Sequence, residues 1–227
     1  MKIQHDAIDA ANFVGWNTSS VTAVKIQRRI FGEQNWQEIR NIPIITSDDL
    51  TFSMFDYTAN SYQVYEYRNV ITADTEYIGP VKKIETRFDG ILIGNNEKCF
   101  VSLLSPKYTQ QREFNTAYVK PFNSQYPHVV YNGAANSSKG TVSGFFNPIN
   151  DDCQIEMKYG PYATEIVDFL SDGTPKFLKT FDGFSWYVQI DTPIKTDYDN
   201  VIGLIKIDFS WTEIGKAPAG LGRLMRG

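Results

Sequence analysis

Apolar and polar residues alternate along many short runs of the chain, which is the pattern of half-buried β-strands. In the run LIKIDFSWTEIG, one side carries Ile205, Ile207, Phe209 and Trp211, and the other carries Lys206, Asp208, Ser210 and Thr212. Earlier runs of the same kind are VKIQRRI (24–30), LTFSM (50–54) and YQVYEYRNVI (62–71). We therefore predict an all-β fold.

Only one segment repeats its apolar residues at helical spacing, and these residues are Tyr162, Ile166, Phe169 and Leu170. Pro161 suits the first turn of a helix, and Gly173 can end the helix in the left-handed conformation. The sequence thus predicts a single helix over residues 162–171 that packs one face on a sheet.

The segment FLKTFDGFSWYVQI, residues 177–190, predicts a β-hairpin. Asp182 and Gly183 form the Asp-Gly pair that favours a two-residue type I′ turn. With this turn, Lys179 lies opposite Trp186, and its stem could lie along the indole ring. One face then consists of Phe177, Phe181, Phe184, Trp186, Val188 and Ile190. Asp182 and Trp186 could instead line a catalytic or sugar site, but turn chemistry and burial account for both.

Changes in this pattern divide the chain into three parts. Residues 1–86 predict a β-sandwich, because short strands alternate with turns at regular spacing. Residues 87–215 predict a second β domain, a sandwich or barrel, which carries the helix. Residues 216–227 form an extended tail containing Arg223 and Arg226. We expect a neighbouring subunit to hold this tail, the alternative being that it folds back on its own domain.

The polar segment 106–127 predicts a long loop, and loops of this length usually serve a function or wrap a neighbour. It is rich in Tyr and Phe, which are residue types favoured at interfaces. We expect this segment and the tail to lie against adjacent chains, with Arg223 and Arg226 pairing with acidic groups there.

Composition and charge narrow the range of partners. The 227 residues carry a formal net charge of −4 and no basic stripe, which argues against a nucleic acid partner. The first residues, MKIQHDAIDAANF, lack the apolar core of a signal peptide, and no run approaches the ~20 apolar residues of a membrane span. We therefore expect synthesis in a cytoplasm and no membrane insertion, with Cys99 and Cys153 as free thiols.

Residue types suited to catalysis or metal binding are scarce. His5 and His128 are the only histidines and fall in different predicted domains, which disfavours a metal site or a nucleophile with a histidine base. The acidic pairs at 48–49 and 151–152 lie among turn-forming residues, where Asp caps and closes turns. No glycine-rich phosphate-binding motif occurs. The sequence predicts no enzyme activity, no metal and no cofactor.

The first part of the chain resembles a fibronectin type III domain. Trp16 falls where the early core tryptophan of such domains lies, and Tyr65 in DYTANSYQVYEYRNV resembles the tyrosine that anchors the corner before the penultimate strand. The resemblance runs from Asn12 to Arg87, although the family's usual proline and leucine before this corner are missing. It implies a spacer or recognition module.

The C-terminal half resembles bacteriophage tail proteins of the distal-tail or baseplate-hub type. The residues that carry this resemblance are, in order, GTVSGFFNP, ATEIVDFLSDG, PKFLKTFDGFSWYVQI and IKIDFSWTEIG, between Phe88 and Gly215. The resemblance implies a structural protein of the virion tail, assembled in the host cytoplasm, whose copies form a ring such as a hexamer with other tail proteins. An appended fibronectin-like domain would face the exterior, which leaves a contact with the host cell surface open.

Two other functions stay open on the sequence. A carbohydrate-binding adsorption module would stack sugars on exposed rings such as Tyr57, Tyr62 or Tyr126, although most aromatic residues fall at alternating core positions. A wall-degrading hydrolase would need a carboxylate pair or a nucleophile with its base, which we do not find. In the leading interpretation, Asp182, Gly183, Trp186 and Tyr65 are structural residues.

Overall fold

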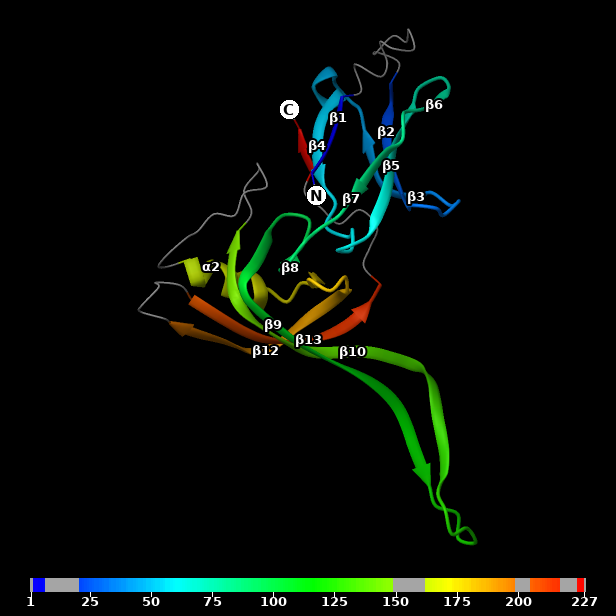
Figure 1. The fold of residues 1–227 in the computed structure, drawn as a ribbon, viewed down its shortest axis with the longest axis vertical. Coiled ribbons are helices and arrows are strands. Elements are labelled where there is room, and N and C mark those ends of the chain that lie inside the picture. Colours follow the sequence, from blue (N-terminus) through cyan, green and yellow to red (C-terminus); the bar gives the residue numbers. More distant parts are fainter. Residues whose placement is uncertain (1, 7–20, 149–161, 199–204, 217–223, 227) are drawn as a thin grey trace.

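The protein has an all-β fold with one α-helix in the described residues (Figure 1). A computed structural model describes residues 2–6, 21–148, 162–198, 205–216 and 224–226. These residues form a β-sandwich and a closed β-barrel, and a long two-stranded arm projects from the barrel. The all-β prediction is confirmed. Trp16 and Cys153 lie outside the described residues.

The sandwich consists of two sheets. The larger has the order β3-β2-β5-β6, with β7 also paired to β5, and the smaller has the order β1-β4-β14. The strands are β1 (Lys2–Asp6), β2 (Ala23–Ile30), β3 (Gln37–Pro43), β4 (Thr51–Phe55), β5 (Val64–Thr72), β6 (Glu76–Ile78), β7 (Lys82–Glu85) and β14 (Leu224–Arg226), and a short 3-10 helix, η2 (Ser47–Leu50), precedes β4. Phe52 and Met54 of β4 are buried against Val24, Ile26 and Ile71 of the larger sheet, so the two sheets share one core.

The C-terminal strand β14 belongs to the sandwich. It pairs antiparallel with β4, with Leu224 opposite Met54 and Arg226 opposite Phe52. The expectation that a neighbouring subunit holds the tail is therefore wrong for these three residues. The edge of β4 offers unpaired backbone groups within the same chain, and a strand that adds to this edge satisfies them. Arg223 lies outside the described residues, and only the backbone of Arg226 is described.

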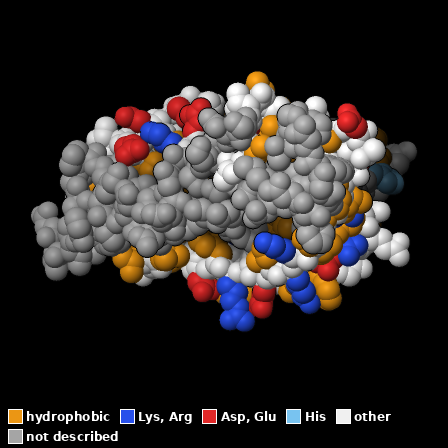
Figure 2. Space-filling view, turned by 90° about the horizontal axis from the view of Figure 1, so that it is seen from above, with side chains coloured by type: hydrophobic (Ala, Val, Ile, Leu, Met, Phe, Trp, Pro, Cys, Tyr) orange, Lys and Arg blue, Asp and Glu red, His pale blue; other side chains and the backbone are white. Residues whose placement is uncertain are grey.

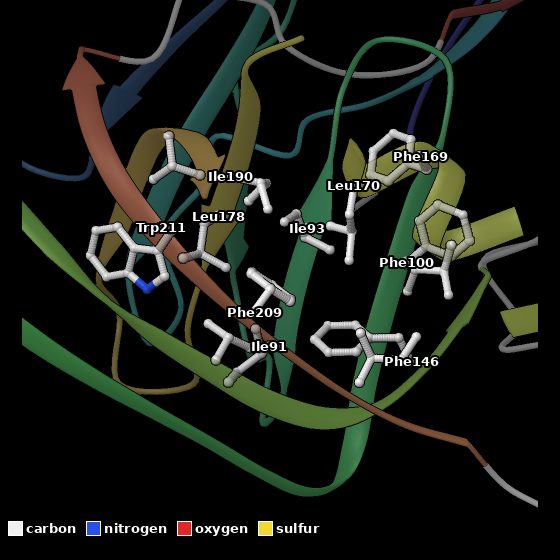
Figure 3. Close-up of a cluster of buried hydrophobic side chains, with 14 of the residues drawn as sticks. Ile91, Ile93, Phe100, Phe146, Phe169, Leu170, Leu178, Ile190, Phe209 and Trp211 are labelled. Atoms are coloured by element: carbon white, nitrogen blue, oxygen red, sulfur yellow. The ribbon is translucent and has the colours of Figure 1, made fainter. Parts of the chain in front are cut away.

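The barrel closes in the order β10-β13-β12-β11-β8-β9. Its elements are β8 (Ile91–Gly94), β9 (Cys99–Val119), β10 (His128–Pro148), α2 (Tyr162–Ser171), β11 (Lys176–Lys179), β12 (Ser185–Tyr198) and β13 (Ile205–Gly215). Helix α2 adds Ile166, Phe169 and Leu170 to the same core as the strands (Figure 3). Phe100 and Phe169, whose ring centroids are 4.9 Å apart, join β9 to the helix.

Two predictions for the barrel are confirmed. The predicted helix over 162–171 is α2, and Gly173 beyond its end has a φ of +75°. The predicted last strand is β13, in which Ile207, Phe209 and Trp211 are buried while the alternate side chains are half-exposed.

The hairpin at 177–190 forms with a different turn from the predicted one. Thr180 N–H donates to the Phe184 carbonyl (2.9 Å), and only Gly183 of the loop has a positive φ, +91°. This is a three-residue loop, in which a type I turn is followed by a left-handed glycine. A type I′ turn would need a positive φ at Asp182 as well, so the predicted turn is wrong.

The longer loop shifts the register of the hairpin by one residue. Leu178, not Lys179, lies opposite Trp186, and Lys179 lies opposite Ser185. Because side chains alternate between faces, Phe177 leaves the predicted apolar face and Lys179 leaves the side of Trp186. Trp186 is 6% exposed and packs on Trp211 with ring centroids 4.9 Å apart.

Alanine substitutions at Gly183 and Gly32 can separate two effects on stability, the strain of a positive φ and the close contact of an added Cβ. Both have a φ of +91°, but a Cβ at Gly183 would lie 3.1 Å from the Ser61 carbonyl oxygen, whereas a Cβ at Gly32 would meet nothing within 4 Å. We expect Gly32→Ala to lower the free energy of unfolding by about 1–2 kcal/mol. Gly183→Ala should lower it further. Urea unfolding measures both, and equal losses would contradict a close contact at Gly183.

Candidate assembly surface

The feature most suited to a role in assembly is the arm formed by β9 and β10. The two strands pair antiparallel from the barrel to Val119 and His128, far beyond the last pair of β10 with β13 at Lys139 (Figure 1). The predicted loop over 106–127 is therefore wrong, since most of it is strand and only the stretch between Val119 and His128 turns the chain. In Figure 1 the arm extends well past the barrel, on the side opposite the sandwich.

A β-bulge marks the point at which β9 leaves the barrel. Leu104 pairs with Phe145 and Lys107 with Ser143, so β9 contains one extra residue here. Ser105 in this bulge has a φ of +46°. Bulges bend a strand and tolerate the missing N–H of a proline such as Pro106. The bulge follows the last pair of β9 with β8 at Ser102, so a bend here falls where β9 leaves that neighbour.

The end of the arm is apolar and exposed. The exposed fractions are 69% for Tyr118, 52% for Val119, 104% for Phe122, 73% for Tyr126, and 48% for both Val129 and Val130. We call these six residues the arm tip. Tyr118 lies opposite Val129, and Val119 opposite His128, so apolar side chains occupy both faces of the ribbon. Apolar groups exposed together in this way usually mark a surface that another molecule covers.

The arm also has unpaired backbone edges and little charge. Strand β9 pairs with β8 only from Cys99 to Ser102, so from residue 103 onward no other described strand pairs with its outer edge. Between residues 114 and 138 the sequence contains a single charged side chain, Lys120, besides His128. A two-stranded ribbon is marginally stable alone in water, and a free edge accepts another strand.

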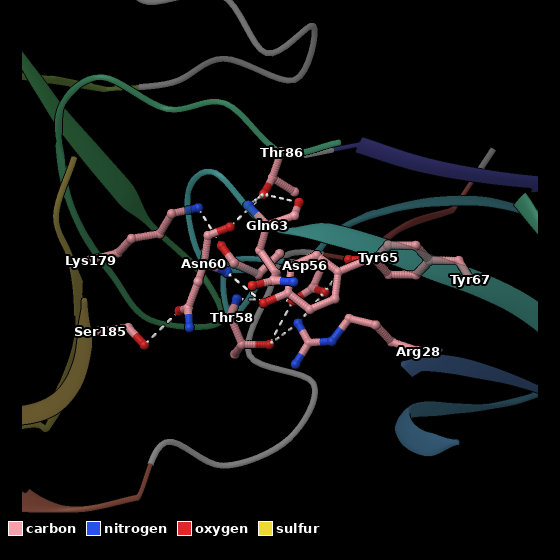
Figure 4. A network of polar contacts seen from close by, with 11 residues as sticks. Arg28, Asp56, Thr58, Asn60, Gln63, Tyr65, Tyr67, Thr86, Lys179 and Ser185 are labelled. Atoms are coloured by element: carbon pink, nitrogen blue, oxygen red, sulfur yellow. Dashed lines mark hydrogen bonds and ion pairs between the residues drawn. The ribbon is translucent and has the colours of Figure 1, made fainter. Parts of the chain in front are cut away.

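A buried network fixes the corner of the sandwich that faces the barrel (Figure 4). The Asp56 carboxylate accepts hydrogen bonds from Arg28 Nη1 (2.7 Å), Tyr67 Oη (2.8 Å) and Thr58 N–H (2.9 Å), and its side chain is fully buried. Burial and the Asp56 charge raise the pKa of the Tyr67 hydroxyl. Tyr65 Oη accepts from Asn60 N–H (3.1 Å), which holds the corner from the core side.

The corner in turn binds the barrel. Lys179 Nζ donates to the Ala59 carbonyl, and Ser185 Oγ donates to Asn60 Oδ1 (2.9 Å). Tyr57 is buried with apolar side chains at the sandwich end of the barrel, among them Phe177. Both polar and apolar contacts therefore set how the sandwich sits on the barrel, and hence how it sits relative to the arm.

Lys179 is an unusual group in this junction because it is only 6% exposed. Burial lowers its pKa to about 8, and the Asp56 carboxylate offsets part of this effect. The Phe88 ring lies under the ammonium, with its centroid 5.1 Å from Nζ. The prediction that Lys179 packs on Trp186 is wrong, because the shifted register turns it toward the sandwich.

The predicted site residues do not form one site. Asp182 Oδ1 accepts from Thr180 Oγ1 (2.6 Å), and Asp182 Oδ2 accepts from Tyr108, whose pKa rises to about 12 through burial and this contact. Gly183 lies in the same loop, and Trp186 lies in the barrel core. Tyr65 lies in the sandwich core. None of these positions is an open pocket, and Trp186 in particular cannot serve as a sugar platform while buried.

The cysteine and histidine side chains that the structure describes do not form a catalytic or metal site either. Cys99 is a buried free cysteine whose pKa burial raises to about 12. His128 lies exposed at the start of β10. Among the residues that the structure describes, no three His, Cys, Asp or Glu side chains gather where they could hold a metal ion. The described helices include none with the length and apolar character needed to cross a membrane.

Sequence reasoning placed segment 106–127 at an interface but missed the ribbon that it forms, and it missed the junction. The six residues of the arm tip are exposed on both faces, so burial leaves no alternation there, and the sequence signal is the clustering of Tyr, Phe and Val around a turn at 120–127. The junction joins Ala59 to Lys179, 120 residues apart, and no local pattern reports such a contact.

Comparisons with known proteins gave matches among solved structures. No protein-family model and no curated protein matches the chain. A chain of the "Virion of native gene transfer agent (GTA) particle" is 14% identical, with a TM-score of 0.35, over 60% of this chain and 95% of its own length. A chain of the "Tail of empty GTA particle" is 10% identical, with a TM-score of 0.31, over 93% of this chain and 98% of its own.

The Lys179 ammonium predicts a specific pH dependence of stability. Its pKa is about 8 in the folded protein against 10.5 for an ordinary lysine, so between these values the unfolded chain binds the extra proton. As the pH rises from 8 to 10, we expect the free energy of unfolding of the wild type to increase by about 2 kcal/mol relative to that of Lys179→Met. Denaturant unfolding across this range measures the difference. Since both proteins contain the same Cys and Tyr residues, parallel profiles would contradict a buried ammonium at position 179.

Proposed function

We propose that the protein is a structural component of a bacteriophage tail, whose copies associate into a ring in the distal tail or baseplate region. The observation that carries the proposal is the arm, which projects from a closed barrel with apolar residues on both faces of its tip. A ring requires each subunit to contact two neighbours through different surfaces, and an arm that reaches away from the barrel supplies such a contact.

The rest of the molecule supports a structural role. The barrel and sandwich cores are filled by their own side chains, and the predicted site residues serve the turn, the core and the corner. The resemblance of GTVSGFFNP, ATEIVDFLSDG and the hairpin to distal-tail proteins fits this role. Other tail proteins are then further partners, and the virion is the site of function.

A carbohydrate-binding module is the second candidate function, but the structure removes one of the three rings expected to stack on a sugar. Tyr57 is 5% exposed and cannot stack on a sugar. Tyr62 is exposed and its hydroxyl donates to Asp89, while Tyr126 belongs to the arm tip.

Changing the arm tip tests the assembly. The variant Phe122→Ser, Tyr126→Ser, Val130→Thr removes exposed apolar groups without changing either core. We expect the wild-type protein to form a closed oligomer whose mass is a multiple of 25.8 kDa, and the variant to be a folded monomer. Light scattering after size exclusion measures the mass, and circular dichroism measures the fold.

A matched control changes exposed apolar residues elsewhere. Ile45 and Ile78 of the sandwich are 80% and 54% exposed. Ile45→Ser with Ile78→Thr should leave the oligomer intact. The proposal fails if the wild-type protein stays monomeric at every concentration, or if the arm-tip variant keeps the same mass as the wild type.

A further inference from the structure

The outer face of the larger sandwich sheet carries cations packed on aromatic rings. The guanidinium carbons of Arg29 and Arg68 lie 4.4 and 4.1 Å from the centroid of the Trp36 ring. Lys83 Nζ lies 3.5 Å from the centroid of the Phe31 ring. Trp36 and Phe31 both belong to the connection between β2 and β3, so this connection lays its rings over the cations of the sheet.

Strand register brings these cations together. Arg29 of β2 lies opposite Glu66 of β5, and Glu66 lies opposite Lys83 of β7. In the next row, Arg68 of β5 lies opposite Gln27 of β2. Since directly opposed residues point to the same face, the three cations share one surface. We call Arg29, Arg68, Lys83 and Trp36 the cationic face.

Of the two guanidinium groups on this face, Arg68 is the one without an ion pair in the described part of the chain. Arg29 Nε pairs with Glu66 at 2.5 Å, whereas Arg68 Nε donates to the neutral amide oxygen of Gln27 at 2.8 Å. Within the described ranges, no carboxylate forms an ion pair with Arg68. Burial and the neighbouring Arg29 charge both lower the pKa of Arg68. The Glu38 side chain, opposite Gln27 on β3, is the nearest further acid in the register. An anion bound here would relieve the repulsion between the two guanidinium groups.

We propose that the cationic face binds an anionic polysaccharide, with Arg68 contacting a carboxylate or phosphate oxyanion of the polymer. A guanidinium presents paired N–H donors in a planar fork that matches such oxyanions, and stacking on Trp36 holds this fork in place. The Gln27 side chain beside it offers an amide to neighbouring hydroxyl groups.

The chemistry of this face favours a saccharide over other polyanions. A protein partner needs an apolar centre to bury, but here guanidinium and ammonium groups already pack on the rings. Nucleic acid needs a wide basic surface, whereas this chain has a net charge of −4. Seen from above the view of Figure 1, the described surface carries both Lys or Arg and Asp or Glu side chains (Figure 2). Glu66 and Glu38 share the strand rows of Arg29 and Arg68, so the cationic face is a small site rather than part of a broad basic patch.

Binding of defined polymers to the full chain tests this inference. The probes are oligogalacturonate for carboxylate, poly(glycerol phosphate) for phosphate, dextran as the neutral polymer and polyglutamate as the acidic polypeptide. Calorimetry should show binding of one or both anionic saccharides, weakened by salt, and no binding of dextran. Arg68→Gln should weaken binding roughly tenfold or more. The probe that binds identifies whether the oxyanion is a carboxylate or a phosphate.

Lys25→Gln is the matched control, because it removes the same charge from the same sheet at a residue already paired with Glu76 (2.7 Å). It should bind like the wild type. Lys83→Gln gives a second variant should Arg68→Gln unfold. The inference is overturned if neither anionic saccharide binds, if polyglutamate binds as tightly as they do, or if both cationic-face variants bind like the wild type. Oligomer mass is measured separately, so this outcome is distinguishable from a failure of the assembly proposal.

Discussion

One antiparallel ladder, β9 against β10, both closes the barrel and builds the arm. Near the barrel, β9 is flanked by β8 and β10 by β13, so both strands have partners on each side. Beyond Ser138, whose N–H donates to the Glu213 carboxylate of β13 (2.8 Å), β9 and β10 pair only with each other among the described strands. The backbone groups on the outer edges and the apolar residues on both faces of the tip are therefore left for another molecule to cover. Folding of the barrel sets the direction in which this surface points.

The sandwich takes its position from the same barrel. The corner at Asp56–Asn60 is held by a buried carboxylate that accepts hydrogen bonds from three residues. It meets the hairpin β11–β12 through Ala59, Asn60 and Tyr57. Burial of the Lys179 ammonium costs stability, as its lowered pKa shows, but it gives the junction a hydrogen bond to the Ala59 carbonyl. The arm and the cationic face belong to different parts of the chain, so the proposed assembly and the proposed polysaccharide binding would use separate surfaces.

The sequence predicted those parts of the fold in which one face is buried. Helix α2 and strand β13 were predicted correctly because Ile166, Phe169 and Trp211 follow the period of their elements. The hairpin turn was wrong by one residue because Asp-Gly suits both a two-residue and a three-residue loop, and the difference depends on φ at Asp182. Segment 106–127 was expected at an interface but not as a ribbon, because exposed strands have no buried face to leave an alternating pattern. The junction at Lys179 depends on contacts between distant segments.

Hydrogen exchange of the arm tests the central claim most directly, since it reports on the backbone itself. Amides of residues 113–119 and 128–137 lie on a ribbon whose outer edges pair with no other described strand of the single chain. If copies cover the arm, these amides should exchange rapidly in dilute monomer and slowly in the assembled protein, while the barrel core stays protected in both. Equal exchange of the arm in the two states would show that it remains uncovered, and would contradict the account.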